Sequence, residues 1–231
     1  MNKAISLAAV VPAAGIGSRM GLNHPKQYLK IGDKTILEHT LSKLSQVDTI
    51  NQIIVAVSDE DGYFENLNLD NLNVTRVSGG KERADSVLNA LKSLRSNPPE
   101  WVLVHDAARP LVDIADIDNL ISSCINAGEG GILACRVKDT IKKGNTHSEH
   151  TVPRDLLWQA LTPQLFPYRA LLQSLESALE DGALITDEAS AMERANQPVQ
   201  LVCGRSDNIK ITTPEDHALA CFLMEQQQKS I

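Results

Sequence analysis

The chain has 231 residues and a net charge of −7 at pH 7, with 42% hydrophobic and 22% charged residues. This acidic balance argues against non-specific binding to nucleic acids or membrane surfaces, although a local cluster of cations can still bind a small anion. Aromatic residues make up 3% of the chain, too few for a base-stacking surface, and no apolar run reaches the roughly 20 residues of a membrane-spanning helix. We therefore expect no nucleic acid and no membrane among the partners.

The N-terminal segment combines Lys3 with an apolar run over residues 4–11, a pattern that also occurs in short signal peptides. The charged part is a single lysine, and a glycine loop follows directly. We therefore interpret the run as a buried first strand.

The loop after this strand reads P-A-A-G-I-G-S-R-M-G over residues 12–21. Met20 breaks both the dinucleotide fingerprint G-x-G-x-x-G and the phosphate loop G-x-x-x-x-G-K-[ST]. Backbone N–H groups of such a small-residue loop can still approach phosphates, and Arg19 and Lys26 are nearby cations. A flexible glycine turn would explain a bare G-x-G, but the whole loop with both cations favours a phosphate site.

Further apolar runs of strand length alternate with segments of helical spacing. The expected strands are 7–11, 53–57, 74–77, 101–104, 131–134 and 199–202. The expected helices cover 36–44, 87–94 and 117–124, and a last one begins at Pro214 with Leu219, Phe222 and Leu223 on its apolar face. The alternation predicts an α/β fold with a mostly parallel sheet and helices on both faces. Because no linker, repeat or low-complexity tract interrupts it, we expect a single domain over residues 1–231.

Residues 137 to about 164 break this rhythm. Gly144-Asn145 lies between two β-capable runs, 139–142 and 150–152, and predicts a hairpin. We interpret the segment as a β-arm that projects from the sheet. Such excursions commonly bind partners or substrates.

Ser78-Gly79-Gly80 follows an expected strand and leads into an expected helix. Free backbone donors and the helix dipole favour an anion or a nucleotide at this place. An ordinary helix start with acidic residues in its first turn explains the same pattern equally well.

Two further motifs come directly after expected strands, at the edge where doubly wound sheets bind their ligands. V-H-D-A-A-R-P over residues 104–110 provides Asp106 for Mg²⁺ or a ribose hydroxyl and Arg109 for a phosphate. The segment 205–214 adds Asp207 and Lys210. For each motif taken alone, an ion pair that closes a turn or a solvated loop is the simpler explanation.

The four cysteines do not form a C-x-x-C zinc or redox motif. Each lies in a largely apolar stretch, which is typical of a small buried side chain in a reducing compartment. We therefore expect buried, free thiols at Cys124, Cys135, Cys203 and Cys221, and a cytoplasmic location.

Together the motifs resemble the 2-C-methyl-D-erythritol 4-phosphate cytidylyltransferase family, nearly from end to end. The shared motifs are V-P-A-A-G-x-G-x-R-M, P-K-Q-Y-L, G-G-x-E-R-A-D-S-V, V-H-D-A-A-R-P, L-T-P-Q, T-D-E-A-S-A and D-N-I-K-I-T-x-P-E-D. The resemblance implies a Rossmann-like nucleotidyltransferase fold, an arm-exchanged homodimer, and Mg²⁺ or another divalent cation as cofactor. It also implies that the enzyme joins CTP to a polyol phosphate, with release of pyrophosphate, in the non-mevalonate isoprenoid pathway.

The resemblance also implies roles for individual residues. Nucleotide contacts would come from Pro12, Ala13, Ala14, Gly15, Gly80, Arg83, Ser86, Asp106 and Ala107. The catalytic cations would be Arg19, Lys26 and Lys210. The methylerythritol phosphate would be bound by Asp106, Arg109, Thr162 and Lys210, with Thr140 and Arg154 from the partner's arm. Because Asp106 and Asp207 stand at strand ends, we expect these two carboxylates to bind the metal. Family members often have an acidic residue after the glycine pair, where this chain has Lys81.

This chemistry fits the residue types. The nucleophile is a phosphate oxygen, which is already anionic near neutral pH, so no general base is required. The difficulty lies in bringing two anions together and stabilising the charge of the leaving pyrophosphate, which positioned cations accomplish. Two alternatives are a ribitol 5-phosphate cytidylyltransferase and a catalytically silent nucleotide-binding module.

Overall fold

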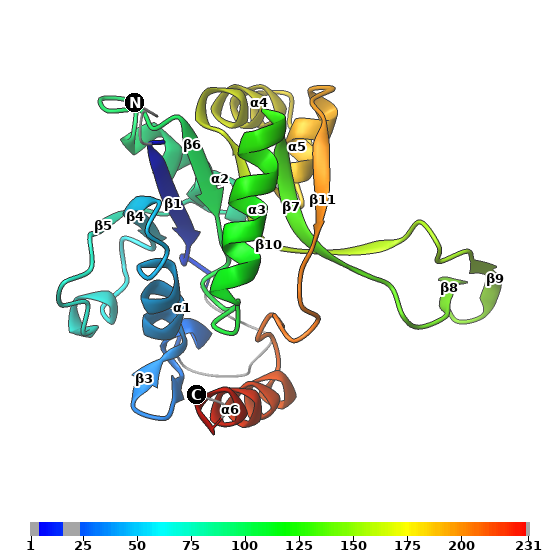
Figure 1. The fold of residues 1–231 in the computed structure, drawn as a ribbon, viewed down its shortest axis with the longest axis horizontal. Helices are drawn as coiled ribbons and strands as arrows, with labels where there is room; N and C mark the ends of the chain where they lie inside the picture. Colours follow the sequence, from blue (N-terminus) through cyan, green and yellow to red (C-terminus); the bar gives the residue numbers. More distant parts are fainter. Residues whose placement is uncertain (1–4, 16–23, 230–231) are drawn as a thin grey trace.

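The computed structural model describes residues 5–15 and 24–229 (Figure 1). Its centre is a seven-stranded sheet in the order β11-β7-β10-β6-β1-β4-β5. The strands are β1 (Leu7–Pro12), β4 (Ile50–Val57), β5 (Val74–Ser78), β6 (Trp101–Val104), β7 (Gly130–Arg136), β10 (Trp158–Pro167) and β11 (Val199–Cys203). Within this sheet β10 runs antiparallel to β6 and β7, and the other pairings are parallel. The expected α/β fold with a mostly parallel sheet is therefore confirmed, and each expected strand lies within one of these strands.

Both faces of the sheet are buried, because successive side chains of a strand point to opposite sides. On β1, Leu7, Ala9 and Val11 belong to one apolar cluster. Ala8 and Val10 belong to a second cluster on the other face. The continuous apolar run of β1 is thus explained by its central place between two layers of helices.

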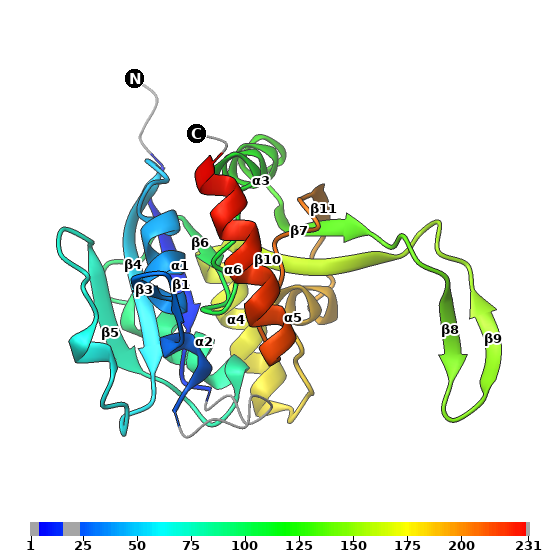
Figure 2. The ribbon, with the colours of Figure 1, turned by 90° about the horizontal axis from the view of Figure 1, so that it is seen from below.

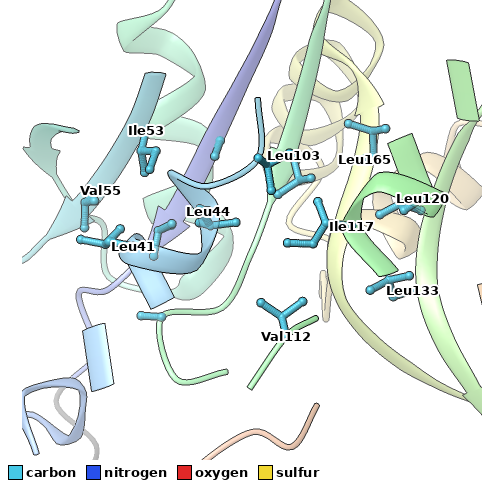
Figure 3. Close-up of a cluster of buried hydrophobic side chains, with 14 of the residues drawn as sticks. Leu41, Leu44, Ile53, Val55, Leu103, Val112, Ile117, Leu120, Leu133 and Leu165 are labelled. Atoms are coloured by element: carbon cyan, nitrogen blue, oxygen red, sulfur yellow. The ribbon is translucent and has the colours of Figure 1, made fainter. Parts of the chain in front are cut away.

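Five helices cover these two faces. They are α1 (Ile36–Leu44) and α3 (Ile114–Ala127) on the first cluster, and α2 (Arg83–Ser93), α4 (Tyr168–Glu180) and α5 (Glu188–Arg194) on the second. Figure 3 shows the first cluster, where Leu44 of α1 and Ile117 of α3 pack with Leu103 of β6. Short elements complete this part of the chain: β2 (Lys30–Ile31), β3 (Lys34–Thr35), and the 3-10 turns η2 (Lys26–Tyr28) and η3 (Phe64–Asn66).

The last helix, α6 (Pro214–Lys229), begins at the expected Pro214. The predicted apolar face of this helix is wrong in part, because Leu219 is 46% exposed and Phe222 is 56% exposed. The helix packs through Ala220 and Met224, which are buried in a third cluster, and the expected Leu223 packs against that cluster partly buried. No helix in the described ranges is long and apolar enough to cross a membrane.

All four cysteines are free, as expected, but they are not all buried. Cys124 and Cys135 lie in the core, whereas Cys221 is partly exposed and Cys203 is exposed. Cys203 ends β11, which is the edge strand of the sheet and has a neighbour on one side only. The apolar sequence around it therefore reflects strand pairing, not burial of that side chain.

A two-stranded arm projects from the sheet between β7 and β10, as Figures 1 and 2 show. Its hairpin consists of β8 (Ile141–Gly144) and β9 (Ser148–Val152), so the predicted hairpin at Gly144-Asn145 is present. The predicted excursion extends too far at its C-terminal end, because β10 pairs with β7 from Trp158 onward. Its motif L-T-P-Q over residues 161–164 lies in the central sheet.

Candidate functional site

A pocket of about 510 Å³ opens at the carboxyl ends of β1 and β6, beside the turn that follows β5. Every residue expected to bind the nucleotide lines it: Pro12, Ala13, Ala14, Gly15, Gly80, Arg83, Ser86, Asp106 and Ala107. Lys26 and Lys210, two of the expected catalytic cations, line it as well. Arg19, the third, lies outside the described residues. Parallel strands bring these distant segments together because their carboxyl ends meet at one edge of the sheet.

The first wall of the pocket is the start of the loop after β1. Ala13 donates its backbone N–H to the carbonyl of Ala56 (2.7 Å), which continues the pairing of β1 with β4. The buried side chain of Gln27 donates to the carbonyl of Ala13 (2.7 Å). Beside it, the ammonium of Lys26 donates to the carbonyl of Ile211 (2.6 Å), so the segment before α6 helps to place this cation.

The second wall is the glycine turn between β5 and α2. The side-chain oxygen of Ser86 accepts from the backbone N–H of Gly80 (2.9 Å), which fixes the turn onto the first turn of the helix. A Cβ atom on Gly79 would lie 2.4 Å from the Cβ of Ala14, well inside van der Waals contact. Glycine is therefore required at position 79 because the two walls touch there.

The floor of the pocket is a cluster of charges around Asp106, which is 6% exposed. Its Oδ1 accepts from Nε of Arg83 (2.9 Å), and its Oδ2 lies 2.9 Å from Nζ of Lys210 and 3.4 Å from Nε of Arg109. Burial alone would raise the pKa of Asp106, but Arg83, Lys210 and Arg109 together lower it far below its usual range. Asp106 is therefore ionised near neutral pH.

Arg109, an expected substrate contact, is buried behind the pocket. Its Nη1 donates to the backbone carbonyl of Asn208 (2.6 Å), and its contact with Asp106 is long for a hydrogen bond. The ion pair that closes a turn, considered above as the simpler explanation, is thus present. A role toward substrate stays a prediction for this residue.

Thr162, another expected substrate contact, lies under Asp106 and is 4% exposed. Its Oγ1 accepts from the backbone N–H of Asp106 (3.0 Å) and lies 3.0 Å from Nδ1 of His105. The other ring nitrogen, Nε2, lies 3.0 Å from the carbonyl of Arg109, which can only accept. Nε2 therefore carries the proton, and the hydroxyl of Thr162 donates to Nδ1. Burial lowers the pKa of His105 to about 4, so the ring is neutral near pH 7.

Of the two expected metal ligands, Asp106 lines the pocket and Asp207 does not. Asp207 is bound through both oxygens to Arg205 (3.0 and 2.6 Å) and does not line the pocket. Across residues 5–15 and 24–229 there is no group of three or more His, Cys, Asp or Glu side chains arranged to hold a metal. Asp106 does fit Mg²⁺, which commonly binds one or two carboxylates and completes its shell with substrate phosphates and water.

The two expected contacts on the arm, Thr140 and Arg154, do not line the pocket either. Both are exposed, and Arg154 donates to the carbonyl of Lys138 within the arm. The arm projects away from the sheet (Figure 2), and neither side chain lines the pocket of its own chain.

His105 and Glu188, which support the pocket without lining it, were not expected from the sequence. His105 stands next to Asp106, but nothing in the motif indicates that its ring is a neutral support for Thr162 and Arg109. Glu188 is fully buried and contacts Arg83 from 105 positions away. Its only sequence signal is its place in the motif T-D-E-A-S-A, where an acidic residue follows a helix cap.

Comparisons with known proteins agree with one another. A family model described as 2-C-methyl-D-erythritol 4-phosphate cytidylyltransferase matches residues 7–226. A protein of that name from Pseudoalteromonas translucida (strain TAC 125) is 62% identical over 99% of this chain and 95% of its own length. Another from Vibrio atlanticus (strain LGP32) is 54% identical over 97% of both chains.

Solved structures give the same result. A crystal structure of 4-diphosphocytidyl-2C-methyl-D-erythritol synthase superposes with a TM-score of 0.84 at 36% identity, covering 95% of this chain and 98% of its own. The Francisella tularensis 2-C-methyl-D-erythritol 4-phosphate cytidylyltransferase superposes with a TM-score of 0.82 at 35% identity, covering 94% and 99%.

Proposed function

Because the chain belongs to the 2-C-methyl-D-erythritol 4-phosphate cytidylyltransferase family, we propose that the pocket at the end of β1 and β6 is its active site. The enzyme is a CTP-dependent nucleotidyltransferase of isoprenoid biosynthesis. It converts CTP and 2-C-methyl-D-erythritol 4-phosphate to 4-diphosphocytidyl-2-C-methyl-D-erythritol and pyrophosphate. One observation carries the assignment of the site: the nine expected nucleotide contacts and two expected catalytic cations line a single pocket.

The glycine turn and the loop after β1 hold the nucleotide in this proposal. Small residues on both walls, with Ala14 facing Gly79, let backbone groups approach the triphosphate closely. The turn also leads into the N-terminus of α2, where the helix dipole favours negative charge. The small size of the side chains at these positions therefore serves close contact with phosphates.

The reaction itself requires positioning and charge neutralisation. A phosphate oxygen of the methylerythritol phosphate forms a bond to the α-phosphorus of CTP, and the bond from that phosphorus to the bridging oxygen of the β-phosphate breaks. No proton has to move, because the attacking oxygen is already an anion. Lys26 and Lys210, with Arg19, would stabilise the charge on the α-phosphate and the departing pyrophosphate.

Mg²⁺ or another divalent cation would be held by Asp106 together with oxygens of the triphosphate. When bound, it would neutralise phosphate charge and align the leaving group. Since the carboxylate of Asp106 is also paired with Arg83 and Lys210, its oxygens would be shared between these cations and the metal. Asp207 would take part only if it left Arg205.

The exposed arm is the basis for a further part of the proposal, a homodimer. Thr140 and Arg154, a hydroxyl and a cation suited to a phosphate, lie on the arm and do not line the chain's own pocket. An arm that crosses to a second copy would bring them to the partner's substrate. We also propose a cytoplasmic location, which the free thiols support.

An assay of pyrophosphate release with CTP tests the substrate assignment. We expect turnover with 2-C-methyl-D-erythritol 4-phosphate and little or none with ribitol 5-phosphate at the same concentration. Preference for ribitol 5-phosphate would transfer the chain to the alternative activity. CTP binding without turnover of either alcohol phosphate would point to a silent nucleotide-binding module.

A further inference from the structure

Glu188 is a fully buried carboxylate that does not line the pocket. It is the first residue of α5, and its two oxygens accept from Nη1 (2.7 Å) and Nη2 (3.0 Å) of Arg83. This is the bidentate geometry in which a guanidinium and a carboxylate bind each other most strongly. A buried charge is costly unless it is paired in this way, so Glu188 and Arg83 depend on each other.

Arg83 connects Glu188 to the pocket floor. While its terminal nitrogens are bound to Glu188, its Nε donates to Oδ1 of Asp106 (2.9 Å). Burial alone would lower the pKa of Arg83, but Glu188 and Asp106 raise it above its ordinary value. The guanidinium is therefore charged and held between two acids, and only Nε is directed at Asp106.

The second oxygen of Asp106 faces Lys210 and, at the longer distance of 3.4 Å, Nε of Arg109. Its Oδ2 lies 2.9 Å from Nζ of Lys210, whose side chain is 39% exposed and lines the pocket. If the terminal nitrogens of Arg83 were released, the guanidinium could turn and bind both oxygens of Asp106. Two parallel N–H···O bonds would then compete with Lys210 for Oδ2.

We propose that Glu188 is a positioning residue of the transferase, which orients Arg83 so that Asp106 holds Lys210 in place. It acts through Arg83 and touches no substrate. The inference rests on the proposed function, in which Asp106 and Lys210 serve the transfer reaction. The geometry of the pocket then depends also on Glu188, which lies 105 positions from Arg83 in the sequence.

The chain offers a matched control in the neighbouring carboxylate, Asp187. It caps α5 by accepting from the backbone N–H of Ser190 (2.9 Å), and it accepts from the side chain of Gln164 (2.9 Å). It belongs to the same motif and the same helix end, but it contacts none of the cations at the pocket. Glu188→Gln and Asp187→Asn each replace a carboxylate with an amide of nearly the same shape.

The experiment compares kcat and KM of these variants per folded molecule, with the folded fraction taken from thermal unfolding. We expect Glu188→Gln to lose roughly 10- to 100-fold in kcat/KM, because small misplacements of catalytic groups have effects of this size. Asp187→Asn should lose stability but keep its kcat/KM. In a Lys210→Ala background, Glu188→Gln should cost much less, because the group it positions is already absent. If Glu188→Gln does not fold, Glu188→Asp keeps the charge but shortens the reach, and we expect the same loss.

Three results would overturn the inference: wild-type kcat/KM in the folded Glu188 variants, an equal loss in Asp187→Asn, or an undiminished loss in the Lys210→Ala background. The crystal structure of Glu188→Gln provides a readout without turnover. We expect Arg83 to bind both oxygens of Asp106, and an unmoved Arg83–Asp106–Lys210 arrangement contradicts the proposal. A failure of the proposed function is distinct, since the wild-type enzyme would then release no pyrophosphate from CTP in the same assay.

Discussion

Among single residues, Lys26 provides the most direct test of the active site. Its ammonium lines the pocket and is oriented by the carbonyl of Ile211. We expect Lys26→Ala to reduce turnover by roughly 100-fold or more, since lost charge stabilisation in such sites costs ~3–4 kcal/mol. Steady-state kinetics measure turnover, and circular dichroism shows that the variant is folded. The exposed Lys34→Ala is the control. Near-normal turnover would remove Lys26 from the catalytic residues, and the same holds for Arg19→Ala.

Removal of the metal tests the role proposed for Asp106. We expect turnover to cease in excess chelator and to return when Mg²⁺ is added, because the triphosphate brings more negative charge than the cations of the pocket can neutralise. With Mg²⁺ present, CTP should be used in preference to UTP, ATP and GTP. Full activity in chelator, or equal use of the four nucleotides, contradicts this part of the proposal.

The neutral ring of His105 makes stability depend on pH. Its pKa is about 4 in the folded chain and about 6.5 in the unfolded chain, so between these values only the unfolded chain binds the proton. This stabilisation is complete above pH 6.5 and is lost as the pH falls toward 4. By linkage, the free energy of unfolding should fall by about 2 kcal/mol between pH 7 and pH 5 from this group alone.

Urea denaturation at the two pH values measures this difference. Asp106 does not contribute to the change in stability between pH 7 and pH 5. Its pKa is lowered in the folded chain, so the stability that it adds is lost only below the unfolded pKa of about 3.9. His105→Asn should be less stable at pH 7 but should lose less on acidification. If the variant loses as much stability as the wild-type chain, His105 is not the titrating group.

The residues of the site differ in how far the sequence reveals them. Pocket residues such as Ala14, Gly80 and Asp106 follow strand ends within short motifs, so their common edge could be predicted. Glu188 could not, because its meaning depends on Arg83, which lies 105 positions away and reaches it only in the fold. Thr162 was expected at the substrate, yet its hydroxyl supports His105 and the backbone of Asp106.

Among elements, the turn between β5 and α2 is constrained by the loop after β1. A methyl group on Gly79 would lie 2.4 Å from the Cβ of Ala14 and 3.1 Å from the carbonyl oxygen of Val57. We expect Gly79→Ala to push the two walls apart and to raise KM for CTP about 10-fold, since overpacking commonly costs 1–3 kcal/mol. Gly62→Ala is the control, because a Cβ there meets nothing within 4 Å. An unchanged KM for CTP would mean that the two walls do not bind the nucleotide together.

The pattern of elements was largely predictable, with one informative exception. Apolar runs such as residues 53–57 and 101–104 are fully apolar because both faces of a parallel sheet are buried. Strand β10 was assigned to the arm, because its residues Gln159, Thr162 and Pro163 interrupt the apolar pattern. Its partners β6 and β7 supply the burial that its own sequence does not indicate.

For the whole molecule, the main question is whether the arm serves the active site of its own chain or that of a partner. The hairpin of β8 and β9 projects away from the central sheet (Figure 2), yet Arg154, which follows β9, is a cation suited to a phosphate. In an isologous dimer, an arm that reaches the partner is matched by an equivalent arm reaching back. Each active site would then combine Lys26 of one chain with Arg154 of the other.

Mixing two inactive variants tests this arrangement. Arg154→Ala and Lys26→Ala homodimers should each be nearly inactive, because every site in them lacks one of the two cations. After subunit exchange at equal concentrations, half of the dimers are hybrids. Each hybrid has one site with both defects and one with neither, so a quarter of all sites are intact. We therefore expect roughly a quarter of wild-type activity to return, measured as pyrophosphate release.

A second mixture separates complementation from a general effect of mixing. Lys26 and Lys210 line the same pocket of one chain, so every site in a hybrid of Lys26→Ala and Lys210→Ala carries one of the two defects. That mixture should stay inactive although its subunits exchange equally well. If exchange is demonstrated with differently labelled chains and the Arg154→Ala mixture also stays inactive, Arg154 does not act on the partner's substrate. Arg154 would then act within its own chain, and the substrate phosphate would be bound by one chain alone.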